Sequence, residues 1–319
     1  MVSRVALVSA RDFFDLDEDL PLVQLALEAR GIGAVIVDWH DRAFEWGSVE
    51  LAVVRSTWDY TSRLDEFIAW AERVASATVL CNPVEILRWN THKRYLIDLA
   101  SAGLPVVPTE LIEPEPGVAP TVSFIAAKLS AALNRFDDEQ AAPEIVVKPA
   151  VSAGARDTER YALSALDLAC EHVNALLAAG RSVLVQPYVR SVDSGGETGL
   201  VFAGDAYSHA FRKDALLGTG SQFVAGHYRE ETISAVEASA DQLKAADAIL
   251  DSVADCVPGR SRRDLLYARV DFATSANGTP LLMELELTEP SLFCAYSPGS
   301  ADRFADAIAG ALGRSEGQC

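Results

Sequence analysis

A predicted β-hairpin near the C-terminal end places the strongest constraint on how this chain folds. Two apolar segments with an alternating pattern, residues 267–273 and 281–287, lie on either side of the dipeptide Asn277-Gly278. Asn-Gly between two such segments is a strong signal for a tight two-residue turn between antiparallel strands. The pattern therefore predicts a hairpin whose register follows from its turn.

The predicted register gathers charged side chains on one face of this hairpin. Counting outward from the turn sets Asp271 opposite Glu284 and Arg269 opposite Glu286. Because side chains alternate along a strand, these four share one face. The other face carries apolar residues: Ala268, Val270, Phe272, Met283, Leu285 and Leu287.

The carboxylates of this face require compensation, since like charges directly opposite one another destabilise a sheet. A hard divalent cation or a charged ligand can supply it. Oxygen ligands without Cys or His favour Mg²⁺ or Mn²⁺. Mg²⁺ held by a few carboxylates usually implies a nucleotide whose phosphates complete the coordination. The alternative is a solvated hairpin face with a cross-strand Arg–Glu pair.

The first 80 residues alternate strand and helix signals. Short apolar runs at residues 5–9, 34–38, 51–54 and 78–80 predict strands. The apolar residues that follow Pro21 and those that follow Leu64 recur at helical spacing, which predicts a helix in each place. This βαβ pattern favours a parallel sheet with helices on its faces.

Ligands of such sheets bind beyond the carboxyl ends of the strands. Three polar segments leave those ends, at residues 9–12, 38–40 and 55–60. The last contains Arg55, Ser56, Asp59 and Tyr60, and we favour a substrate contact there over a solvated turn.

A second α/β unit follows, with helices expected at residues 121–134 and 165–179 and strands at 144–148 and 183–186. Beyond it, one long helix is expected at residues 236–255 and a final helix at 300–312.

Lys148 ends the apolar strand of this unit, where a lysine is costly to bury unless it meets an anion. The small-residue segment Val151-Ser-Ala-Gly-Ala-Arg156 follows, of a kind that lets backbone N–H groups approach phosphate. The alternative is a lysine that reaches solvent before a flexible loop. No G-x-x-x-x-G-K-[ST] sequence occurs, so this is not a P-loop protein.

Composition excludes several classes of partner. The net charge of −19 opposes binding to nucleic acid, and no run of about 18 apolar residues indicates a membrane span. The five cysteines show no C-x-x-C spacing, and no secretory signal precedes the first strand. These features predict a cytoplasmic protein with reduced thiols.

The order of these motifs resembles that of the ATP-grasp superfamily, in its glutathione-synthetase-like group. The resemblance covers about residues 80–300, and the βαβ start matches the N-terminal domain of that family. It implies an α/β fold in three parts: a parallel N-terminal domain at 1–90, a small subdomain with a phosphate loop at 91–190, and a subdomain with the metal ligands at 191–319. The last two, of α+β type, would clasp ATP between them.

The resemblance also implies roles for individual residues. The family's two phosphate-binding lysines match Lys93 and Lys148, and its phosphate loop matches Ser152 and Gly154. Its adenine-binding hinge matches Gln186, Pro187, Tyr188 and Val189, and its ribose contact matches Glu197. The magnesium (or manganese) ligands match Asp271, Glu284 and Glu286. Cationic residues near the transferring phosphate match Arg269, Arg212 and Lys213. The chain departs from the family in Glu286, where Asn is frequent, and in Gln186, where Glu is frequent.

The implied activity is that of an ATP-dependent carboxylate–amine ligase. A small amino-acid-type carboxylate would become an acyl phosphate, which an amine-type nucleophile then attacks. Ser291 and the neighbouring backbone would hold the substrate carboxylate. The segments at 55–60, 90–93 and 283–293 most resemble a bacterial subgroup that serves antibiotic biosynthesis. That resemblance implies intramolecular cyclisation of O-ureido-D-serine to D-cycloserine.

Two other interpretations remain open from the sequence. One is an ATP-binding regulatory or phosphotransfer module on the same fold, and the other is a two-domain dehydrogenase, which the missing glycine fingerprint disfavours. Related ligases are commonly oligomers, so a homo-oligomer is a further expectation.

Overall fold

The computed structural model describes residues 4–115, 121–134, 144–217 and 232–316. Three sheets follow one another along the chain, and each lies within one of the three predicted segments. The described part of the chain confirms the expected α/β class, with a parallel sheet first and antiparallel sheets after it. We keep the exact segment boundaries as a proposal.

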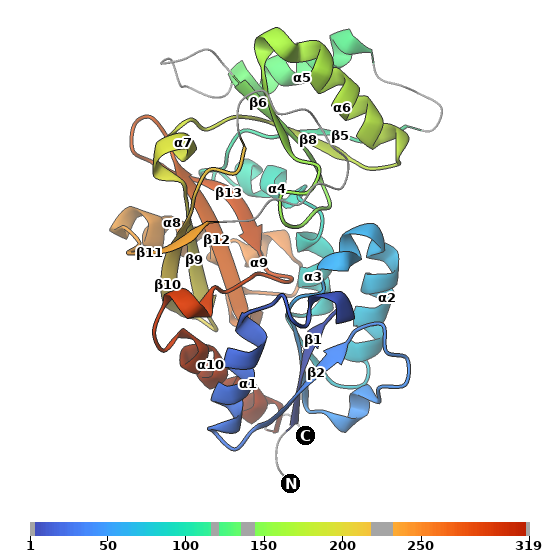
Figure 1. The fold of residues 1–319 in the computed structure, drawn as a ribbon, viewed down its shortest axis with the longest axis vertical. Coiled ribbons are helices and arrows are strands. Elements are labelled where there is room, and N and C mark those ends of the chain that lie inside the picture. The colour runs from blue at the N-terminus through green and yellow to red at the C-terminus, as the bar shows by residue number, and fades with distance from the viewer. Residues whose placement is uncertain (1–3, 116–120, 135–143, 218–231, 317–319) are drawn as a thin grey trace.

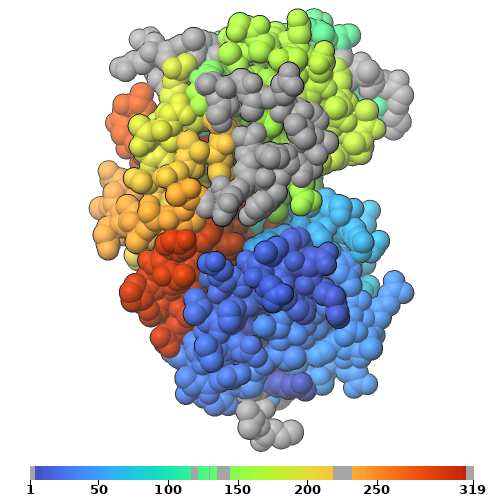
Figure 2. Space-filling model, viewed as in Figure 1, coloured from blue at the N-terminus to red at the C-terminus, as the bar shows by residue number. Residues whose placement is uncertain are grey.

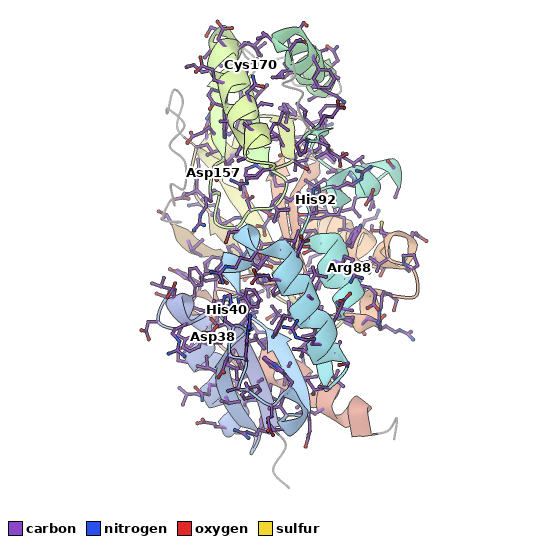
Figure 3. The ribbon with its side chains drawn as sticks, turned by 90° about the vertical axis from the view of Figure 1, so that its right-hand side faces the viewer. Asp38, His40, Arg88, His92, Asp157 and Cys170 are labelled. Atoms are coloured by element: carbon purple, nitrogen blue, oxygen red, sulfur yellow. The ribbon has the colours of Figure 1, made fainter. Side chains whose placement is uncertain are left out.

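The first sheet is parallel and has the strand order β2-β1-β3-β4. Its strands are β1 (Arg4–Ser9), β2 (Gly33–Asp38), β3 (Leu51–Val54) and β4 (Val79–Cys81). The helices of this region are α1 (Asp19–Glu28), α2 (Leu64–Ala75) and α3 (Val84–Asn90). Helix α2 buries Phe67, Trp70, Ala71 and Val74, the helical spacing that an amphipathic helix uses against a sheet. Asp38 ends β2 and His40 follows it, at the carboxyl edge of this sheet (Figure 3).

The second sheet is antiparallel and forms the upper part of Figure 1. Its order is β5-β8-β6-β7, with β5 (Glu110–Ile112), β6 (Glu144–Pro149), β7 (Glu159–Ala162) and β8 (Val183–Pro187). Helices α5 (Val122–Asn134) and α6 (Leu166–Ala178) pack on it through Ile125, Val173 and Leu176. Helix α4 (Tyr95–Ser101) comes before this sheet in the chain.

The third sheet is antiparallel, with the order β11-β10-β9-β12-β13. Its strands are β9 (Glu197–Ala203), β10 (Ala206–Lys213), β11 (Ile233–Val236), β12 (Tyr267–Thr274) and β13 (Pro280–Glu286). The helices of this part are α7 (Ser191–Gly195), α8 (Ala240–Asp251), α9 (Val253–Cys256) and α10 (Ser300–Glu316).

The single long helix expected at residues 236–255 is wrong. Val236 ends strand β11, and helix α8 begins only after Ser239. Ser239 and Gln242 form a reciprocal capping box, which satisfies the free N–H groups of a helix start. Ser252 then separates α8 from the short helix α9.

Helix α10, near the C-terminal end of the chain, packs against the N-terminal region. It lies beside α1, and Arg30 donates to Asp306 and Asp302 across this contact, at 2.6 and 2.9 Å. Figure 2 shows the C-terminal residues against the N-terminal residues on one face of the molecule. No helix among the described residues has both the length and the apolar character needed to cross a bilayer. None of the four cysteines in the described ranges forms a disulfide.

Candidate active site

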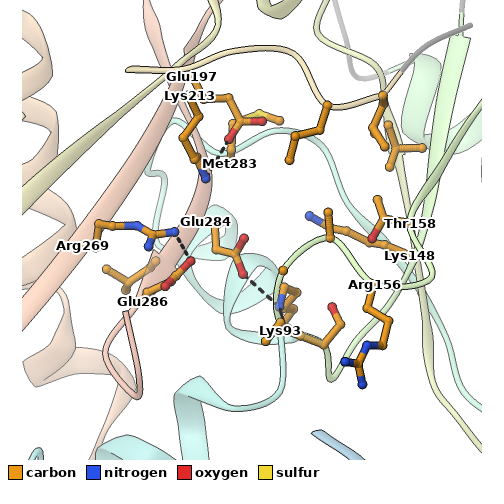
Figure 4. Close-up of a pocket in the computed structure, with 18 of the residues that line it drawn as sticks. Lys93, Lys148, Arg156, Thr158, Glu197, Lys213, Arg269, Met283, Glu284 and Glu286 are labelled. Atoms are coloured by element: carbon orange, nitrogen blue, oxygen red, sulfur yellow. Dashed lines mark hydrogen bonds and ion pairs between the residues drawn. The ribbon is translucent and has the colours of Figure 1, made fainter. Parts of the chain in front are cut away.

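A cavity of about 210 Å³ lies where the three parts of the chain meet. Its wall includes residues from the N-terminal domain (Trp58), the second sheet (Lys148) and the third sheet (Glu284). Figure 4 shows Lys93 and Lys148 on one side of this space, Arg269 and Glu286 on the other, and Glu284 between them.

The β12–β13 hairpin supplies one wall, and its predicted register at the charged residues is confirmed. Asp271 pairs with Glu284 and Arg269 pairs with Glu286. The turn itself is longer than the Asn-Gly prediction, because β12 ends at Thr274 and β13 begins at Pro280. The pairing near the loop is therefore offset by one residue from the predicted one.

A β-bulge beside Asp271 corrects this offset. Phe272 pairs with Leu282, whereas Asp271 pairs with Glu284, so Met283 is the extra residue. The bulge moves Met283 away from the apolar face that holds Val270 and Leu285, and Met283 lines the cavity instead. The expectation that Met283 belongs to that apolar face is wrong for this reason.

The acids of this wall are neutralised by neighbouring cations. Glu284 forms an ion pair with Lys93 at 2.9 Å, and Asp271 one with Lys213 at 2.6 Å. Arg269 donates to both Asp271 and Glu286. Burial alone would raise the pKa of Asp271, but Arg269 and Lys213 outweigh it and lower the pKa to about 2.

Glu286, despite its contact with Arg269, and Glu289 have carboxyl groups that remain electrostatically crowded. Burial raises the pKa of Glu286 to about 8, and the charges of Glu284 and Asp271 act in the same direction against Arg269. Burial also raises the pKa of Glu289 to about 7. A bound cation would stabilise the charged forms of these carboxylates, so their arrangement favours a cation-binding site.

The donor set fits Mg²⁺ in part. Glu284 and Glu286 line the cavity and offer hard oxygen ligands, whereas Asp271 is fully buried behind them and held by Arg269 and Lys213. No group of three or more His, Cys, Asp or Glu residues among those described is arranged to hold a metal ion. The role of Asp271 as a metal ligand therefore stays a prediction.

All nine residues that the sequence predicted for the nucleotide line this cavity: Lys93, Lys148, Ser152, Gly154, Gln186, Pro187, Tyr188, Val189 and Glu197. Lys148 is the penultimate residue of β6, where burial lowers its pKa to about 8. The loop after β6 has left-handed backbone at Gly154, Ala155 and Asp157, and Lys93 Nζ donates to the carbonyl of Ser152 at 2.7 Å. The groups needed to bind phosphates are thus gathered in one place.

The predicted phosphate-transfer residues are only partly brought together. Arg269 and Lys213 line the cavity. Arg212 does not, because neighbouring side chains of β10 alternate, and it pairs instead with Asp214 at 3.3 Å.

The predicted substrate residues also separate into two groups. Tyr60 and Ser291 line the cavity, whereas Arg55, Ser56 and Asp59 do not. Arg55 is buried, lies 3.6 Å from Asp19 and donates to the carbonyl of Pro290 at 2.9 Å.

The other two residues are held by side chains of the N-terminal domain. Ser56 shares a hydrogen bond of 2.6 Å with Ser9. Asp59 accepts from Trp39 at 2.9 Å and contacts His40 at 2.6 Å.

Sequence reasoning missed Phe13, Trp58, Arg156 and Glu289, which also line the cavity. Trp58, Arg156 and Glu289 lie inside segments that the sequence had already marked, so their side-chain chemistry was the available signal. Phe13 lies in a short 3-10 turn after β1 and offered none.

Comparison with known proteins identifies relatives of this chain. Residues 5–82 match the family model of the N-terminal domain of the D-cycloserine synthetase DcsG. The cycloserine biosynthesis protein DcsG of Streptomyces lavendulae is 38% identical over 313 residues, which cover 96% of this chain and 97% of that protein. A crystal structure of D-cycloserine synthetase DcsG superposes with a TM-score of 0.85 at 38% identity, over 97% of this chain and 100% of that chain.

More distant structures share the fold. The D-alanine–D-alanine ligase of Bacillus anthracis, solved with ATP, has a TM-score of 0.61 at 12% identity and covers 99% of this chain and 100% of its own. The ATP-grasp ligase PsnB, solved with Mg and ADP, has a TM-score of 0.61 at 18% identity and covers 97% and 98%. The alternative of an ATP-binding module without ligase activity is not favoured by these relatives. The chain belongs to the D-cycloserine synthetase DcsG family and is an ATP-grasp carboxylate–amine ligase.

Proposed function

We propose that this enzyme uses Mg-ATP to close the ring of D-cycloserine from O-ureido-D-serine. The observation that carries the substrate is the 38% identity to the cycloserine biosynthesis protein DcsG across 96% of the chain. The cavity supports the reaction class, because phosphate-binding lysines, paired acids and an aromatic wall meet in it. The cytoplasm suits such an enzyme, since ATP is its energy source there.

Activation of the carboxylate is the first step. A substrate carboxylate oxygen attacks the γ-phosphorus of ATP, the bond to the β-phosphate oxygen breaks, and ADP leaves. Lys93, Lys148 and Arg269 stabilise the negative charge on the transferring group. Mg²⁺ held by Glu284 and Glu286 would neutralise charge on the β- and γ-phosphates.

Ring closure is the second step. The nitrogen bonded to the side-chain oxygen of the substrate attacks the activated carbonyl, and phosphate leaves with the former carboxylate oxygen. The attacking nitrogen loses its proton. After ring closure, water hydrolyses the bond between this nitrogen and the carbamoyl group; the ring nitrogen takes a proton, and the carbamoyl group leaves as carbamate. Acyl phosphates react readily with water, so the loop at Ser152 to Arg156 serves to keep water from this carbonyl.

The test is ADP release with Mg-ATP across a panel of small amino acids that includes O-ureido-D-serine, with mass-spectrometric identification of the product. We expect release with O-ureido-D-serine alone and one D-cycloserine formed per ADP. Release that requires a second amine would replace ring closure by an intermolecular ligation. Release with a different carboxylate would keep the ligase class and change the substrate.

A further inference from the structure

The charged residues of the cavity wall are not all neutralised. Four lining acids have a cationic partner among the described residues: Glu197 with Lys213, Asp214 with Arg212, Glu284 with Lys93, and Glu286 with Arg269. The fifth, Glu289, has no ion-pair partner in the part of the chain that the structure describes. A half-buried carboxylate without a cation calls for one from a ligand.

Glu289 is held in place by the N-terminal domain. Tyr60 lines the cavity beside it, and its hydroxyl group acts on the pKa of the Glu289 carboxyl group. Trp58 Nε1 donates to its backbone carbonyl at 3.0 Å, and Phe13 packs edge-on against Trp58 with ring centroids 5.3 Å apart. The carboxylate therefore stands at an aromatic wall, which itself favours an organic cation over a hydrated metal ion.

Glu289 stands beside the phosphate-binding groups as the ammonium group of an amino acid stands beside its carboxylate. Glu289 lines the same cavity as Lys93, Glu284 and Arg269, and their charges act on its pKa. The reacting carboxylate must come to those groups, and in an α-amino acid only one carbon atom separates the carboxylate from the ammonium nitrogen. The ammonium group must then lie beside the carboxylate subsite, at the lining acid that still lacks a cation.

We infer that Glu289 binds the α-ammonium group of the amino-acid substrate, with Tyr60 orienting its carboxylate. This inference rests on the proposed function and adds the residue that distinguishes an amino acid from other small carboxylates. Glu289 touches the substrate but not the reacting bond, so it acts on binding rather than on the chemical step.

The experiment compares two substrates: O-ureido-D-serine and the same compound with a hydroxyl group in place of the α-ammonium. Wild-type enzyme should release ADP with the amine at a kcat/KM at least about 10-fold higher than with the hydroxy acid, since a charge-assisted hydrogen bond contributes that much. In Glu289→Gln, the KM for the amine should rise about 10- to 100-fold while that for ATP stays unchanged. The preference for the amine should fall towards about 1.

Two further variants sharpen the result. Tyr60→Phe keeps the carboxylate and removes the hydroxyl group beside it, so the preference should fall by only about 3-fold. Glu85→Gln makes the same chemical change outside the cavity, where Glu85 pairs with Arg260 at 2.7 Å, and should leave the preference intact.

Equal use of both substrates by the wild-type enzyme would overturn the inference without any variant, as would an unchanged preference in Glu289→Gln. Absence of ADP release by wild-type enzyme with every amino acid tested would instead overturn the proposed function, and the inference with it.

Discussion

Two segments of the chain reach the cavity in different ways. On the β12–β13 hairpin, Arg269 and Glu286 face the cavity together because alternate side chains of paired strands point to one side. The segment from Arg55 to Tyr60 leaves β3 and turns into a 3-10 helix at Trp58–Ser62. Its side chains point to Pro290, to Ser9, to His40 and to the cavity in turn.

The difference separates residues that we propose for the chemistry from residues that hold the cavity wall in place. A regular hairpin presents a repeating set of functional groups to one ligand. The irregular segment instead ties the N-terminal domain to the loop that carries Glu289 and Ser291. Asp19 completes this arrangement by accepting from the backbone N–H groups of Leu292 and Cys294, at 2.6 and 2.7 Å.

The largest effect is expected on the hairpin. Glu284→Gln removes a cavity carboxylate that we propose as a metal ligand, so kcat/KM should fall about 10³-fold while the protein stays folded. ADP release and far-UV circular dichroism measure the two quantities. Glu72→Gln, on the exposed face of α2, is the matched control. Full activity in Glu284→Gln would remove the metal assignment.

Substitutions in the irregular segment should lower the stability of the protein rather than its catalytic rate. Arg55→Met breaks a buried ion pair and leaves Asp19 without its cation, which should lower the free energy of unfolding by about 3 kcal/mol. The KM for ATP should not change. Urea denaturation measures the loss, and Arg11→Met, at an exposed ion pair, should cost less than about 1 kcal/mol. Wild-type stability combined with a raised substrate KM would restore Arg55 as a substrate contact.

Lys148 tests whether the cavity lysines bind an anion. Lys148→Met removes one charge-assisted contact, and we expect the Kd for ATP to rise about 10- to 100-fold in isothermal titration calorimetry. The control is Lys128→Met on α5, where the lysine pairs with Glu110 of β5, and it should leave the Kd unchanged. An unaltered Kd in Lys148→Met would mean that this lysine does not contact the nucleotide.

The same lysine predicts a pH dependence. Burial lowers the pKa of Lys148 to about 8, so the free enzyme loses this positive charge as the pH rises through that value. ATP binds the protonated form, and its affinity should therefore fall between pH 7 and pH 9, by at most about 10-fold per pH unit. Lys148→Met should abolish this difference. A pH-independent affinity in the wild-type enzyme would contradict the prediction.

The smallest effect is expected at Asp59. Its carboxylate contacts Trp39 and His40 rather than the cavity. Asp59→Asn should change kcat/KM for the amino-acid substrate by less than about 3-fold, and the free energy of unfolding by about 1 kcal/mol. A loss of activity comparable to that of Glu284→Gln would erase the distinction between the two segments.

Regular elements account for most of what was predictable from the sequence. The register of Arg269 and Asp271 against Glu286 and Glu284 was predicted by counting from the Asn-Gly turn, and it holds because the bulge at Met283 offsets the longer loop. The position of Lys148 near the end of a buried strand could likewise be predicted from the sequence. The hinge and loop residues from Ser152 to Val189 needed the family resemblance, because no local pattern assigns their role.

The remaining features depend on contacts between distant parts of the chain. The bulge at Met283 arises from a loop longer than the Asn-Gly turn, and no residue pattern marks it. The ion pair of Glu284 with Lys93 joins residues 191 positions apart, so local pattern does not predict that this acid is neutralised. The sequence by itself determined which side chains share a face along an unbroken strand, because that periodicity is covalent in origin. Only the tertiary structure decided which acid lacks a cation, because charge balance depends on distances between elements that the chain order does not set.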